Sequence, residues 1–241
     1  MVTTLTTRRK HQDGLTLVEL LVGMVIMGIV TTMLLMTWFS LNRSYAYSVN
    51  SAVARDDARQ ALARMEREIR DAQATATAVA AVVEAHPYWI CFTTTFNNAG
   101  NDSPATPPHL VVYRLYTDNK LWRFEDTDNS GTIANVSLAD HPSGASPNVA
   151  EEESGEGAML LCRSVVNLVA PATPLFMYNY YSNAGALVTV SSVSDVNNQT
   201  ARIVAVQTHL RVDLSPSRSP VYTDFLTTAT LRNYTTATPQ D

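Results

Sequence analysis

One apolar stretch near the N-terminus restricts what this chain can fold into. Residues 15–41 contain a single charged side chain, Glu19, and the part from Leu20 to Leu41 contains none. As a helix, Leu20–Leu41 would rise about 33 Å, which is enough to cross the hydrocarbon core of a bilayer. We therefore expect a membrane-spanning helix over residues 15–41.

The residues before this stretch predict its orientation. Positions 8–10 read Arg-Arg-Lys, and only Asp13 opposes them before the apolar residues begin. Basic residues beside a membrane helix stay on the cytoplasmic side. We expect a single-pass protein of the cytoplasmic membrane, with its N-terminus in the cytoplasm and its C-terminal part outside.

Gly14 differs in position from the cleavage site of a secretory signal. An ordinary signal has a shorter apolar region, and its small-residue cleavage site follows that region. Here the small residue precedes the apolar stretch. A protease that cut at Gly14 would leave the helix on the mature protein.

Glu19 is the second unusual residue of this segment. A carboxylate inside a membrane helix costs about 2.5–3.5 kcal/mol on insertion scales, so such residues usually have a function. The alternative is that Glu19, only four positions after Leu15, reaches the lipid headgroups and has no specific partner.

The basic leader followed by Gly14-Leu15-Thr16-Leu17-Val18-Glu19 resembles the type III signal of type IV prepilins and pseudopilins. The resemblance implies that residues 1–14 are a leader, that prepilin peptidase cuts between Gly14 and Leu15, and that Leu15 is then N-methylated. Leu15 differs from the commoner Phe. The resemblance also implies that Glu19 meets the N-terminal ammonium of a neighbouring pilin or pseudopilin. An opposite charge would make this carboxylate tolerable in a dry environment.

Beyond the apolar stretch the sequence becomes amphipathic. Apolar residues recur at spacings of three and four, which predicts that the helix continues through residues 42–80 with one buried stripe: Ala54, Ala58, Ala61, Leu62, Met65, Ile69, Ala72 and Ala76. The charged residues on the other faces are expected to be a solvated surface rather than a specific recognition site: Arg55, Arg59, Arg64, Glu66, Arg67, Glu68, Arg70 and Asp71.

Residues 81–241 have the signature of β-structure. Runs rich in β-branched and aromatic residues alternate with turn residues: 88–96, 110–116, 120–125, 175–181, 186–190, 202–212 and 221–231. Thr117-Asp118-Asn119 predicts a hairpin turn. One helix followed by strands indicates an α+β fold, with the helix stripe packed on an antiparallel sheet. The resemblance to prepilins implies that this fold is pilin-like.

Three segments resemble the larger minor pseudopilins and minor pilins of the PulJ/PilW group: Ala61–Ala72, Leu160–Tyr181 and Phe225–Asn233. This resemblance implies a low-copy structural subunit of a type IV pilus or a type II secretion pseudopilus. It does not distinguish these machines from one for DNA uptake.

Two residue sets have an open assignment. Cys91 and Cys162 are either a disulfide, if they lie outside the cytoplasm, or two separate buried thiols. Asp126, Asp128 and Ser130 match the start of a calcium-binding loop, but position twelve is Ser137 where a bidentate Glu is needed. A solvated turn is the alternative, and we expect no other cofactor.

The sequence contains no catalytic motif. The five histidines are scattered without H-E-x-x-H, and there is no G-x-S-x-G, Walker A or G-x-G-x-x-G. The part after Glu19 carries 14 basic and 20 acidic residues, which argues against nucleic-acid binding. We expect a structural subunit and no enzyme; the alternative is a signal-anchored domain with its own binding or hydrolytic activity.

Overall fold

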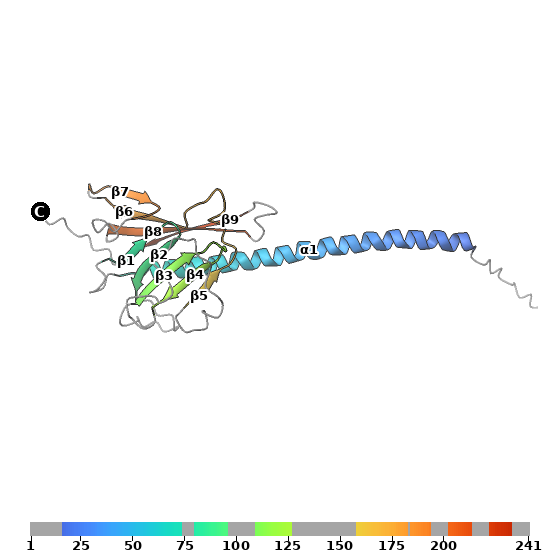
Figure 1. Ribbon diagram of the computed structural model, residues 1–241, viewed down its shortest axis with the longest axis horizontal. Helices are drawn as coiled ribbons and strands as arrows, with labels where there is room; N and C mark the ends of the chain where they lie inside the picture. Colours follow the sequence, from blue (N-terminus) through green and yellow to red (C-terminus); the bar gives the residue numbers. More distant parts are fainter. Residues whose placement is uncertain are drawn as a thin grey trace, which may run out of the picture. The chain divides into compact units, whose positions relative to one another are not determined.

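The computed structural model describes residues 16–73, 80–95, 109–126, 158–182, 184–193, 202–213 and 222–232 (Figure 1). The chain divides into two compact units, residues 1–49 and 50–241. Helix α1 (Leu17–Arg70) contributes its N-terminal part to the first unit and its C-terminal part to the second.

The predicted long helix is confirmed, but its end is earlier than residue 80. Helix α1 ends at Arg70, because the following residues join a strand. Ala72 forms an antiparallel bridge with Thr94, and the Gln73 N–H donates to the Thr93 carbonyl at 3.0 Å. No Gly or Pro marks this end, so the tertiary pairing of the chain determines it.

The described part of the second unit contains two antiparallel sheets in place of the single sheet expected (Figure 1). Sheet A has the order β1 (Val82–Ala85), β2 (Trp89–Thr94), β3 (His109–Leu115), β4 (Leu121–Glu125) and β5 (Met159–Cys162). Sheet B has the order β7 (Leu187–Val190), β6 (Phe176–Tyr181), β8 (Ile203–Val212) and β9 (Thr223–Thr230). Strands β1 and β5 were not predicted, and each has only four residues and an irregular register with its neighbour.

The hairpin predicted between β3 and β4 is confirmed. Strands β3 and β4 pair antiparallel, with Leu115 opposite Leu121. The Tyr116 N–H donates to the Lys120 carbonyl at 3.0 Å, and Asn119 has a φ of 65°. Asparagine tolerates this left-handed conformation better than most residues, which explains why the turn forms at this position.

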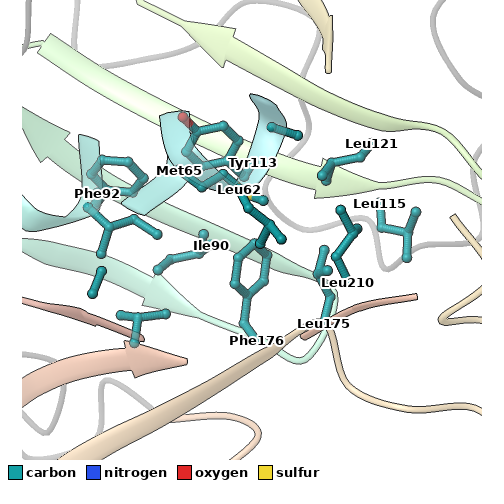
Figure 2. Close-up of a cluster of buried hydrophobic side chains, with 14 of the residues drawn as sticks. Leu62, Met65, Ile90, Phe92, Tyr113, Leu115, Leu121, Leu175, Phe176 and Leu210 are labelled. Carbon is teal, nitrogen blue, oxygen red and sulfur yellow. The ribbon is translucent and has the colours of Figure 1, made fainter. Parts of the chain in front are cut away.

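The helix stripe packs against both sheets. Every stripe residue predicted up to Ala72 is buried, and Ala76 lies outside the described residues. Figure 2 shows Leu62 and Met65 of α1 among large side chains from the two sheets: Ile90, Phe92, Tyr113, Leu115 and Leu121 from sheet A, and Phe176 and Leu210 from sheet B. The small residues Ala54, Ala58 and Ala61 let the helix backbone approach these sheets closely.

Glu68 is the exception to the predicted solvated face of α1. Its side chain is fully buried and accepts hydrogen bonds from Tyr113 Oη at 2.6 Å and from Arg123 Nε at 2.9 Å. Arg64 Nε donates to the same carboxylate at 2.9 Å. The prediction of a solvated position was therefore wrong for Glu68. The carboxylate is tolerated in the core because two guanidinium groups and a phenol compensate it.

The network continues along β4. Arg123 Nη1 lies 2.6 Å from Glu125 Oε2, and His109 Nε2 lies 3.1 Å from Glu125 Oε1. Burial acts to lower the pKa of the Arg123 guanidinium, but Glu68 and Glu125 outweigh it and hold that pKa above its ordinary value. Burial lowers the pKa of His109, so the imidazole favours its neutral form. Helix α1 and sheet A are thus joined by a charged contact inside the apolar core.

We expect Glu68→Gln to destabilise the protein by about 3–5 kcal/mol, because it leaves the buried Arg123 charge without its main partner. The matched control is Asp56→Asn on the same helix, where Asp56 lies 3.8 Å from Arg59 and both side chains are largely exposed. That change should alter stability by less than about 1 kcal/mol. Urea unfolding of the full-length chain in detergent measures both, and equal midpoints would contradict a stabilising role for Glu68.

Candidate functional site

The start of α1 forms the candidate assembly site. Gly14 and Leu15 lie outside the described residues, which begin at Thr16. The Glu19 N–H donates to Thr16 Oγ1 at 3.3 Å, and the Thr16 N–H donates to Glu19 Oε2 at 3.2 Å. This reciprocal pair is a capping box, which satisfies two N–H groups that a helix start otherwise leaves without partners.

The capping box leaves part of the Glu19 carboxylate available. Thr16 Oγ1 also donates to Oε2 at 3.1 Å, so both bonds from Thr16 go to the same oxygen. Among the described residues, none donates to Oε1. A carboxylate in the first turn is favoured by the positive end of the helix dipole. Glu19 can therefore hold the helix start and still present one oxygen to a cation.

This geometry adds a role that was not expected from the sequence. The sequence predicts that Glu19 either pairs with a neighbouring ammonium group or reaches the headgroups. The spacing Thr-x-x-Glu directly before an apolar run is the capping-box signature, and this signal was present in the sequence.

The apolar part of α1 is exposed on all sides within the first unit. Each residue from Thr16 to Val49 is exposed, and the helix contains a segment long and apolar enough to cross a membrane. Its threonine hydroxyls bond to carbonyls one turn earlier: Thr31 to Met27 at 2.7 Å and Thr32 to Gly28 at 2.8 Å. These bonds satisfy polar groups that would be costly to expose to lipid.

The two cysteines are separate thiols. Both are buried and free, on β2 and β5 of sheet A. These strands are three positions apart in the sheet, which corresponds to about 14 Å, whereas a disulfide requires Cα atoms within about 7 Å. Cys162 faces the core shared with α1, and Cys91 packs with Trp89 and Trp122 in a second cluster. The disulfide alternative is therefore wrong for this structure.

The calcium hypothesis stays a prediction. Asp128 and Ser130 lie outside the described residues, while Asp126 follows β4 and is buried. Among the described residues, no group of three or more His, Cys, Asp or Glu side chains is arranged to hold a metal ion.

Comparison with known proteins identifies a family motif in the sequence around the helix start. Residues 9–35 match the family described as the prokaryotic N-terminal methylation motif. This match includes Gly14, Leu15, Thr16 and Glu19, and it ends before the second unit begins. Comparison with curated proteins finds no significant relative. The chain carries a signal of the type IV pilin and pseudopilin kind. Prepilin peptidase acts on signals of this kind. The apolar helix of the chain is consistent with membrane anchoring.

We expect Thr16→Ala to fray the first turn of α1, because it removes the hydroxyl that caps the Glu19 N–H. Thr16→Ser keeps the hydroxyl and is the matched control. Amide hydrogen exchange of the full-length chain in detergent should be about fivefold faster at Glu19 in the alanine variant, equivalent to about 1 kcal/mol of capping energy. Equal exchange rates in the two variants would argue against the capping box.

The two thiols should be unreactive in the folded protein. Burial raises the pKa of Cys162 to about 12 and raises that of Cys91 further above its usual range. The reactive form is the thiolate, and at pH 8 its fraction in the folded state is then very small. Iodoacetamide should modify neither cysteine without denaturant and both in guanidinium chloride, as read by intact mass. Rapid modification of the folded chain would contradict the burial of these residues.

Proposed function

We propose that this chain is a minor pilin or pseudopilin, a low-copy structural subunit of a type IV pilus or a type II secretion pseudopilus, and that it has no enzymatic activity. The observation that carries the proposal is the methylation signal joined to an exposed apolar helix whose first turn is capped by Glu19.

The proposed maturation follows from the signal. Prepilin peptidase cuts between Gly14 and Leu15, removes residues 1–14 and methylates the new N-terminus at Leu15. The chain then stays in the cytoplasmic membrane through α1, with its second unit outside. The basic residues at positions 8–10 support this orientation.

Glu19 is the proposed assembly residue. Its Oε1 is free of described partners, so it is positioned to accept the N-terminal ammonium of a neighbouring subunit while Oε2 keeps the cap. In the membrane interior, such an ion pair is strongly favoured over two separate charges. Pairing at one position along each helix would set the register between neighbours.

The proposal of a minor rather than a major subunit rests on the sequence resemblance to the PulJ/PilW group. The segments similar to the PulJ/PilW group include Ala61–Ala72 and Phe225–Asn233. The first supplies buried residues of the helix stripe, and the second overlaps most of β9. The similarity thus involves segments that build the fold, and it favours a subunit with a large head.

We expect co-expression with a prepilin peptidase to yield a chain that begins at N-methylated Leu15, as determined by mass spectrometry. Gly14→Ala should block the cut, because the peptidase site requires the small residue. Glu19→Ala should be cut but should fail to enter the fibre, whereas the capping variant Thr16→Ser should be cut and assembled. A mature protein that retains Met1 beside an active peptidase would contradict the proposal.

A further inference from the structure

The four edge strands of the two sheets differ sharply. Strands β1, β5 and β7 have four residues each, and β1 and β5 also have a register irregularity. Strand β9 has eight residues and pairs with β8 through eight consecutive positions without a shift. Natural proteins usually keep exposed edges short, bulged or charged, because a long regular edge invites another strand. Among the edge strands that the structure describes, β9 is the exception.

The hydrogen-bond pattern of β8 shows which backbone N–H and C=O groups of β9 do not bond to β8. The Leu231 N–H donates to the Val204 carbonyl at 3.0 Å, and the His209 N–H donates in the opposite direction, to Leu175, at 2.8 Å. Because partners alternate along an antiparallel strand, odd-numbered residues of β9 bond to β8. Even-numbered residues direct their N–H and C=O groups to the free edge: Asp224, Leu226, Thr228 and Thr230.

Within the described part of the chain, no residue hydrogen-bonds to the backbone of these four residues. Just after β9, the Arg232 N–H does have a partner, because it donates to the Arg70 carbonyl at the end of α1 at 3.2 Å. The four side chains are exposed, and Leu226 is 71% exposed. Strand β9 has one charged residue, Asp224, and it has no Lys, Arg or Pro to protect the edge.

We propose that the free edge of β9 binds an extended segment of a different subunit, which adds a strand to sheet B. This inference rests on the proposed function as an assembly subunit. Four N–H and four C=O groups in a regular row are complementary to an extended backbone, and such an addition gains affinity mainly from main-chain hydrogen bonds. Leu226 would favour an apolar side chain beside it on the added strand.

The direction of β9 argues against a second copy of this chain as the partner. Thr227 Oγ1 donates to Glu66 at 3.0 Å, and Arg232 bonds to Arg70, so β9 runs in the direction of α1. Two copies packed with the C-terminal parts of their α1 helices side by side and parallel would present β9 strands that run in the same direction. Such strands would form a parallel ladder, which is less stable than an antiparallel one. We therefore expect the added segment to run opposite to β9.

The test is photo-crosslinking of the full-length chain in cells that produce it and its prepilin peptidase naturally. The photoreactive residue p-benzoylphenylalanine replaces Thr228, and a control chain carries it at Leu187, an exposed position of the short edge strand β7. We expect position 228, and not 187, to give an adduct with another subunit that carries the methylation signal, mapped by mass spectrometry to an extended segment.

The mature N-terminus is determined in the same sample. If the chain is not cut at Gly14, the proposed function itself fails. If it is cut and position 228 gives no more adduct than position 187, or gives an adduct only with a second copy, the inference about β9 is overturned and the proposed function stands.

A pair of proline variants distinguishes damage to the free edge of β9 from damage to the fold of sheet B. Thr228→Pro removes only a free-edge N–H, whereas Thr227→Pro removes one that faces Thr208 on β8. With the photoreactive residue at Leu226, Thr228→Pro should lower the adduct about tenfold and keep the thermal midpoint within about 2 °C, and Thr227→Pro should lower the midpoint. An unchanged adduct in a folded Thr228→Pro chain would overturn the inference.

If that variant does not fold, Leu226→Lys with the probe at Thr228 tests the same edge. An undiminished adduct in this variant would again overturn the inference.

Discussion

A single helix has to suit two environments, and the rest of the structure depends on this constraint. The N-terminal part of α1 is apolar on all sides, as a membrane requires, while the part that belongs to the second unit has one apolar stripe and charged faces. The change occurs without Gly or Pro, so the helix stays continuous from Leu17 to Arg70. Both sheets are then arranged around the stripe of this helix.

The position of Glu68 shows how a buried charge can specify packing. Its carboxylate contacts Arg64 on the same helix and Tyr113 and Arg123 on sheet A. An apolar stripe alone allows a helix to rotate or slide by small steps, because hydrophobic contacts are not directional. Hydrogen bonds from two strands to one carboxylate permit only one rotation of the helix about its axis and one position of the helix along the sheet.

Much of this architecture could be predicted from the sequence, and the failures have physical reasons. Spacings of three and four predicted the buried stripe, and runs rich in β-branched and aromatic residues between turn residues predicted most strands. The end of α1 was missed because Ala72 leaves the helix to pair with Thr94, which is a contact distant in sequence. Glu68 was placed in solvent by its charge, although its spacing from Met65 and Ala72 puts it on the stripe. The signal at Gly14 and Glu19 was recognised, but the capping role of Thr16 was not.

The capping box has a consequence for maturation. Both of its residues, Thr16 and Glu19, lie on the C-terminal side of the proposed cut, and the hydrogen bonds that make up the box run between these two residues. Removal of the leader would therefore keep both partners of the box in the chain and would change the charge in front of them, because a basic peptide is replaced by one ammonium group. The precursor and the mature subunit would share a folded helix, and proteolysis would act on this protein as a change of charge and not as a trigger of folding.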